Sequence, residues 1–112
     1  MDVELLVVPD CPNEAPAAAL LRTALDDVGL VRIPVTRTVI DTPEQAERRG
    51  FVGSPTILID GDDPFAEPGQ PAALACRIYR STTGPAGIPD LRQLRQALKR
   101  AAAANLQERG AV

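Results

Sequence analysis

Apolar and polar residues along the first half of the chain follow a pattern that predicts two strands with a helix between them. The nearly continuous apolar run over residues 3–8 is typical of a buried strand. Over residues 16–28 the apolar side chains recur at helical spacing, and Gly29 follows as a helix stop. Residues 31–40 are rich in β-branched side chains and predict a second strand, parallel to the first because a helix intervenes.

The next segment carries a clear helix start. Thr42 fits the N-cap position, Pro43 the first helical position, and Gln45 completes a capping box. The helix that they begin is short and ends near residues 49–50. A third strand is predicted over residues 56–60, where apolar β-branched side chains return.

The remainder of the chain predicts a long loop, a short strand and a final helix. Residues 61–75 are rich in proline, aspartate and glycine, which favours a loop, and residues 76–80 predict the fourth strand. Asp90 and Gln93 mark the start of the last helix, and residues from about 100 to 112 are expected to be a frayed helix end or tail. The buried stripe of that helix is predicted to consist of Leu91, Leu94, Leu98 and Ala101.

The predicted element order is βαβαββα, within a single domain over residues 1–112. Right-handed crossover places the first two strands side by side in parallel, and the last two strands are expected to form an antiparallel hairpin. The expected fold class is therefore α/β, with a four-stranded mixed sheet, helices on both faces and a long loop before the fourth strand.

Composition narrows the function more than it narrows the fold. Only 3% of residues are aromatic, so the core must be aliphatic, and the net charge of −3 argues against nucleic acid as a partner. No apolar run approaches the roughly 18 residues of a membrane span, and the first residues lack a basic signal region, so we expect a cytoplasmic protein. The absence of histidine excludes Ser-His-Asp and Cys-His catalysis and histidine-bound metals. We expect no cofactor.

The two cysteines are the strongest candidates for chemistry, and Cys11 lies where the first strand meets the first helix. Asn13 is the better N-cap for that helix, because in a helix that began at Pro12 the proline at position 16 would remove an interior hydrogen bond. A helix N-terminus favours the thiolate form of a nearby cysteine, which is the reactive form.

Two acidic neighbours oppose that activation. Asp10 and Glu14 flank Cys11, and negative charge disfavours a thiolate. No lysine lies nearby in the sequence to offset them. Activation of this thiol is therefore expected to be weaker than in a dithiol enzyme.

Two segments resemble the thioredoxin-like superfamily: "DCPNE" at residues 10–14 and "RGFVGSPT" at residues 49–56. The first is similar to the active-site cysteine segment, and the second to the segment that ends in the cis-proline. The resemblance implies a thioredoxin-like fold, a cis bond before Pro55, and a proline that faces Cys11. It also implies that the backbone of Ser54 is free to pair with an extended substrate.

The sequence departs from that family at Glu14, which replaces the second cysteine of Cys-x-x-Cys. The resemblance therefore implies a monothiol redox or thiol-transfer protein that uses Cys11 with a small-molecule thiol or a protein thiol or disulfide. If the protein is an enzyme, which stays open, it is a thiol–disulfide oxidoreductase. A non-catalytic thioredoxin-fold binding module is the alternative.

A looser resemblance links "GSPTILIDGDDPF" and "ACRIY" to small proteins similar to organomercurial, or alkylmercury, lyases. It implies that Cys11 and Cys76 hold mercury as thiolates while Asp10 protonates the departing carbon. These three residues fill such roles only if the fold brings them together.

The predicted hairpin separates the two cysteines. Cys76 begins the fourth strand at the end of the sheet away from Cys11, so we expect it to be mostly buried and Cys11 to be exposed beside Pro55. A mixed disulfide on Cys11 should then persist, because no thiol is placed to attack it. A Cys11–Cys76 disulfide stays open, since the loop over residues 61–75 could shift the register of the strand.

Two charged groups are given ordinary structural interpretations. The acidic residues 60–63 suit a turn better than a calcium site. Arg77 and Arg80 are interpreted as solvent-exposed, with recognition of a small thiol's carboxylate as the alternative.

Overall fold

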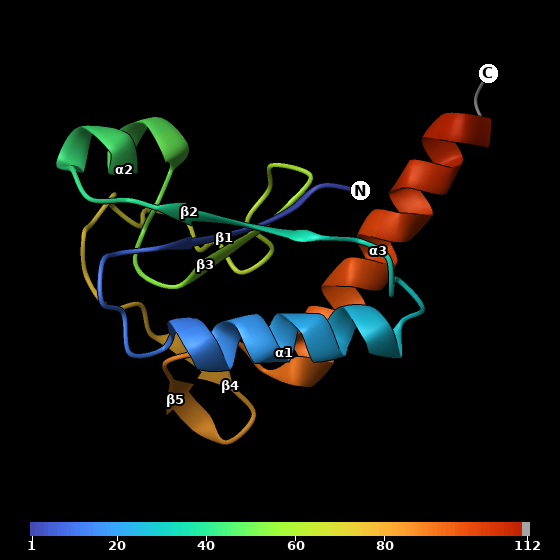
Figure 1. The fold of residues 1–112 in the computed structure, drawn as a ribbon, viewed down its shortest axis with the longest axis horizontal. Helices are drawn as coiled ribbons and strands as arrows, with labels where there is room; N and C mark the ends of the chain where they lie inside the picture. Colours follow the sequence, from blue (N-terminus) through green and yellow to red (C-terminus); the bar gives the residue numbers. More distant parts are fainter. Residues whose placement is uncertain (111–112) are drawn as a thin grey trace.

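A three-stranded sheet in the order β2-β1-β3 lies at the centre of the computed structural model, which describes residues 1–110 and the side chains of residues 1–107 (Figure 1). Strand β1 (Val3–Val7) runs parallel to β2 (Val35–Val39), as predicted. Strand β3 (Thr56–Ile59) runs antiparallel to β1 on its other side. The sheet is therefore mixed, and β1 is its central strand.

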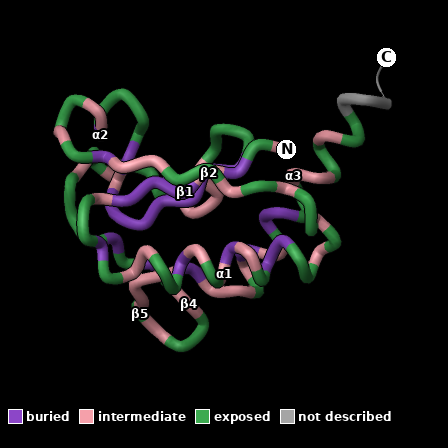
Figure 2. Tube along the Cα trace, in the orientation of Figure 1, coloured by how far each residue is buried: buried purple, intermediate pink, exposed green. Residues whose placement is uncertain are grey.

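Helices cover both faces of this sheet, as Figure 1 shows. Helix α1 (Glu14–Asp27) and helix α3 (Leu91–Gly110) pack on one face, and the short α2 (Pro43–Arg49) packs on the other. The alternation of side chains along β1 divides the core between the two faces. The larger cluster contains Val3, Leu5, Val7, Cys11, Leu21, Leu25, Ile57, Leu94 and Leu98. The smaller contains Leu6, Ile40, Ala46, Phe51 and Leu58. Figure 2 shows this buried band along β1 and the facing side of α1.

The predicted four-stranded sheet is wrong. Strand β4 (Tyr79–Ser81) pairs with β5 (Gly84–Ala86) in a separate two-stranded sheet, and Cys76 forms an isolated bridge with Ser54, just ahead of β3. A two-residue turn closes the β4–β5 pair, so this local pairing costs little loop entropy. Residues 61–78 form no strand that belongs to either sheet. Their hydrogen bonds go to side chains and to isolated backbone groups instead.

Strand β2 is shorter than predicted, because residues 31–34 form a turn. The guanidinium of Arg22 donates to the carbonyl of Ile33 at 2.7 Å and to that of Leu30 at 3.0 Å. A side chain from α1 thus takes acceptors that a longer strand would have offered to the sheet. The β-branched composition of this stretch was outweighed by this long-range contact.

The helix starts agree with the predictions. Asn13 is the N-cap of α1, and the capping box of Thr42 and Gln45 is present at α2. At the start of α3 a carboxylate oxygen of Asp90 accepts from the backbone N–H of Arg92 at 2.8 Å, and this hydrogen bond lowers the pKa of Asp90. The backbone of α3 is helical to Gly110, through most of the range for which a frayed end was expected, and residues 111–112 lie outside the described part.

Within the described residues, the helices are too short or too polar to cross a bilayer.

The capping box of α2 yields a stability prediction. Thr42→Ala removes the side-chain oxygen that accepts from Gln45 N–H, and we expect the free energy of unfolding to fall by about 1 kcal/mol. Glu47→Ala, in the same helix and exposed, should change it by less than about 0.5 kcal/mol. Urea unfolding of the three proteins measures both values. Equal losses in the two variants would contradict a specific role for the cap.

Candidate functional site

The chain between β1 and α1 makes two tight turns, and Cys11 lies between them. Asp10 adopts a left-handed backbone conformation with φ of 58°. The carbonyl of Cys11 then accepts from the backbone N–H of Glu14 at 3.2 Å, where the helix begins. Cys11 therefore precedes the N-cap, as the position of Pro16 in the first turn predicted.

The residue that follows the β4–β5 hairpin, Gly87, lies against the start of α1. A Cβ atom on Gly87 would overlap the side-chain amide of Asn13, so the backbone at residue 87 rests directly on the N-cap. Figure 1 shows β4 and β5 beside the first turn of α1. This segment limits access to the helix N-terminus that Cys11 precedes.

The expected exposure of the two cysteines is wrong, because their environments are exchanged. Cys11 is 9% exposed and belongs to the larger core cluster, whereas Cys76 is exposed. Both thiols are free. The resemblance to thioredoxin-like proteins implied an exposed Cys11, but the fold places it in a core cluster whose members come from distant parts of the chain.

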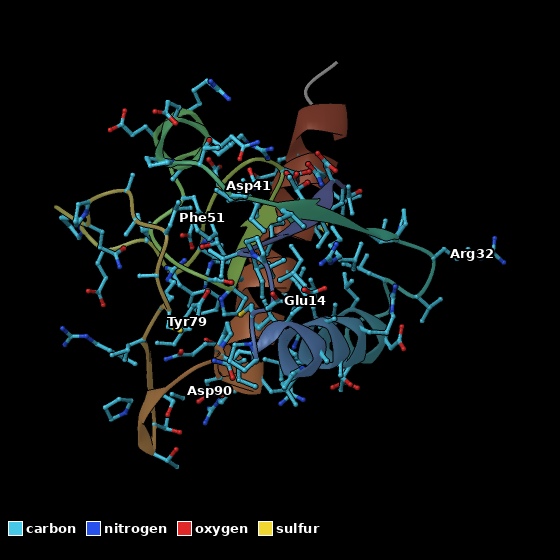
Figure 3. The ribbon with its side chains drawn as sticks, turned by 60° about the vertical axis from the view of Figure 1, so that its left-hand side comes forward. Glu14, Arg32, Asp41, Phe51, Tyr79 and Asp90 are labelled. Carbon is cyan, nitrogen blue, oxygen red and sulfur yellow. The ribbon has the colours of Figure 1, made fainter. Side chains whose placement is uncertain are left out.

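An arginine from β2 balances the charge beside Cys11. Both carboxylate oxygens of Glu14 accept from the guanidinium of Arg37, one of them at 3.0 Å from Nη2, and this hydrogen bonding lowers the pKa of Glu14. Arg37 is distant from Cys11 along the chain, so the sequence alone did not reveal this positive charge. The fold brings Arg37 to the first residue of α1, Glu14, which is labelled in Figure 3.

The bond between Ser54 and Pro55 is cis, as predicted. Ser54 is fully buried, and its hydroxyl oxygen accepts from the backbone N–H of Val8 at 3.0 Å. That hydrogen bond ties the segment ahead of β3 to the end of β1, three residues before Cys11.

The expectation that the backbone of Ser54 is free for a substrate is wrong. Its N–H donates to the carbonyl of Ala75 at 2.7 Å, and its carbonyl accepts from Arg77 N–H at 2.9 Å. Ala73 N–H also donates to the carbonyl of Phe51 at 3.1 Å. Residues 73–77 therefore run alongside residues 51–54 in parallel and occupy the position where an extended ligand would pair.

This pairing also places Cys76 at a different end of the sheet from the one predicted. Cys76 bridges Ser54 in the parallel direction, at the end of the sheet where β1 ends and β3 begins. The predicted hairpin had put Cys76 at the opposite end from Cys11. The long loop before it shifts the register, which was the alternative left open, and both cysteines lie at one end of the sheet.

Arg77 is the anchor of this segment and is buried, with 4% exposure, so its interpretation as solvent-exposed is wrong. Its guanidinium donates to the Asp63 carboxylate at 2.7 Å, to the carbonyl of Phe65 at 2.9 Å and to the Thr56 hydroxyl at 3.2 Å. Gly53 permits this approach, because its φ is +140° and an added Cβ would lie 2.9 Å from that of Arg77. Asp63 therefore serves as the partner of a buried charge.

Tyr79 extends the same cluster to the cis-proline. The guanidinium of Arg77 lies 4.5 Å from its ring centroid, and its hydroxyl donates to the carbonyl of Pro55. Phe65 packs edge-on at 5.5 Å between ring centroids. Burial raises the pKa of the Tyr79 hydroxyl, so it stays a donor. The alternation in "ACRIY" places Arg77 and Tyr79 on one face, and this signal could have identified both residues.

A cavity of about 310 Å³ lies between the loop after β3 and helix α3, and it does not include either cysteine. Arg80 lies at its rim, is solvent-exposed and pairs with Glu67 at 3.2 Å, as the sequence suggested for this arginine. Among the described residues, no group of three or more cysteine, aspartate or glutamate side chains is placed to hold a metal ion.

Comparison of the chain with models of protein families, with curated proteins and with solved structures gives no match.

The buried Arg77–Asp63 pair yields the second prediction. Arg77→Ala leaves the carboxylate of Asp63 without its partner, and we expect a loss of about 3–5 kcal/mol in the free energy of unfolding. The matched control is Arg80→Ala, which removes an exposed pair with Glu67 and should cost at most about 1 kcal/mol. Denaturant titration of both variants tests this, and similar small losses would show that the buried pair is not an anchor.

The third prediction concerns thiol labelling of the native protein. We expect Cys76 to be alkylated at nearly the rate of free cysteine, and Cys11 about tenfold or more slowly, because reagent must wait for local opening. Peptide mass mapping after timed labelling distinguishes them. Labelling of Cys11 faster than Cys76 would contradict the burial of the Cys11 thiol.

Proposed function

We propose that the protein exchanges thiols and disulfides at Cys11, next to cis-Pro55, with a small-molecule thiol or a protein thiol as its partner. The observation that supports this most is the set of hydrogen bonds made by Ser54. Its hydroxyl joins the end of β1 and its backbone joins residues 75–77, so the segments that carry both cysteines meet at this residue. The resemblance of "DCPNE" and "GSPT" to thioredoxin-like segments supports the same proposal.

Two sources of positive charge lie at the end of α1 that Cys11 precedes. Cys11 precedes a helix of 14 residues, whose first backbone N–H groups favour negative charge nearby. Arg37 balances Glu14, which removes part of the repulsion expected from the sequence. Thiolate attack on a disulfide sulfur is the chemistry that this environment favours.

Access to Cys11 requires movement. The backbone hydrogen bonds that join residues 73 and 75 to residues 51 and 54 would have to open before a bulky disulfide reaches the buried thiol. Few hydrogen bonds hold this ladder, and such short segments are the ones that open locally below the global unfolding energy. The proposed exchange is therefore gated by the chain itself.

A non-catalytic binding module is the second candidate, and the burial of Cys11 favours it. In that case the thiol contributes packing only, as a small apolar side chain. A partner strand that binds at Ser54 would have to replace residues 75–77, because both backbone groups of Ser54 are already paired.

Handling of mercury by two thiolates remains the third candidate. Cys11 and Cys76 lie at one end of the sheet, whereas the predicted hairpin had separated them, and this placement favours the mercury-handling candidate. Asp10, with its left-handed backbone, is adjacent to Cys11 as the proton donor that this chemistry would need.

A mixed-disulfide assay tests the proposed exchange. In Cys76→Ser, we expect oxidised glutathione to form a mixed disulfide on Cys11 while circular dichroism shows the protein folded. The rate should be insensitive to urea below the unfolding transition, because local opening exposes little surface. The Cys11→Ser, Cys76→Ser double variant is the control without a thiol. If the Cys11 adduct appears only as the protein unfolds, the binding module is favoured instead.

A further inference from the structure

We infer that Cys76 is a second reactive thiol, which meets the external disulfide first and passes it to Cys11 as an internal Cys11–Cys76 disulfide. This inference rests on the proposed exchange at Cys11. It also reverses the sequence-based expectation that an adduct on Cys11 would persist for lack of an attacking thiol.

Exposure decides which thiol meets the partner. Cys76 is exposed, and Cys11 is 9% exposed within the core cluster. An attacking thiolate must approach in line with the two sulfur atoms of a disulfide, and this geometry needs open space around the thiol. Cys76 has that space in the described conformation, whereas Cys11 requires an opening step.

The position of Cys76 connects it to the site. Residues 73–77 pair in parallel with residues 51–54, and Cys76 is the residue bridged to Ser54. Neighbouring strands lie about 4.8 Å apart, so Cys76 is one strand spacing from Ser54, whose hydroxyl contacts Val8 near Cys11. The bridge therefore places Cys76 in the chain segment next to Ser54.

The buried cluster around Arg77 holds Cys76 there. Arg77 follows directly and is fixed by Asp63, Phe65 and Thr56, so the backbone of the exposed cysteine is anchored from one side. On the preceding side, residues 74 and 75 are exposed, and only the backbone hydrogen bonds of residues 73 and 75 hold the chain. Opening of these two bonds would let the sulfur of Cys76 turn toward Cys11 while the guanidinium of Arg77 keeps its partners.

The chemistry balances as two exchange steps. The Cys76 thiolate attacks a small-molecule disulfide, forms a mixed disulfide and releases one small thiolate. The Cys11 thiolate then attacks the Cys76 sulfur, forms the internal disulfide and releases the second small thiolate. The small disulfide is reduced to two thiols, the two cysteines are oxidised, and an external dithiol reverses the process. Closure requires the two Cβ atoms to come within about 3.5–4.5 Å, so residues 74–76 must shift toward Cys11.

Intact-mass analysis with oxidised glutathione as the probe tests the inference. Wild type, Cys76→Ser and Cys11→Ser are treated under folding conditions and quenched with acid at timed intervals. Cys11→Ala is included in case serine in the core impairs folding. We expect wild type to lose the mass of two hydrogens without a lasting adduct, at least about tenfold faster than Cys76→Ser gains its adduct on Cys11. Cys11→Ser should hold a lasting adduct on Cys76.

The outcomes separate this inference from the proposed function. A lasting adduct on Cys11 in wild type, formed at the rate seen in Cys76→Ser, would overturn the role of Cys76 and leave exchange at Cys11 intact. A lasting adduct on Cys76 in wild type, with no reaction of Cys11 in Cys76→Ser, would overturn both.

Discussion

The guanidinium of Arg77 carries a positive charge with almost no access to water, and its partners hold together the end of the sheet where both cysteines lie. Asp63 supplies the opposite charge, a carbonyl and a hydroxyl take further N–H groups, and Tyr79 offers its ring face. An unpaired charge at this depth would cost several kcal/mol, so these partners must stay together. The long loop, the start of β3 and the segment of Cys76 are thereby held in one arrangement.

That arrangement bears on the proposed chemistry, because the segment that carries Cys76 is also the one paired with Ser54. The backbone groups of Ser54 that an external strand would need are bonded to residues 75 and 77. The proposed exchange therefore depends on how easily a few hydrogen bonds open. The anchored Arg77 limits such opening to the residues before it, which is where the exposed thiol lies.

Local signals were sufficient where neighbouring residues decide the structure. The capping box of α2, the N-cap at Asn13 and the buried strand β1 all follow from spacing within a few residues, and the structure confirms them. Long-range contacts decided the rest. Arg22 shortened β2, and Arg37 balanced Glu14, although neither arginine is near its partner in the sequence.

The sequence by itself determined an α/β chain with an aliphatic core. Because the chain contains no histidine, catalysis and metal binding by histidine are excluded, and the two cysteines are the main candidates for chemistry. Only the tertiary structure decided that the sheet has three strands, that Cys11 is covered and that Cys76 is exposed beside Ser54. The physical reason is the register of the chain after β3. A loop of this length can return in several ways, and the burial of one charged side chain, rather than any local propensity, selects among them.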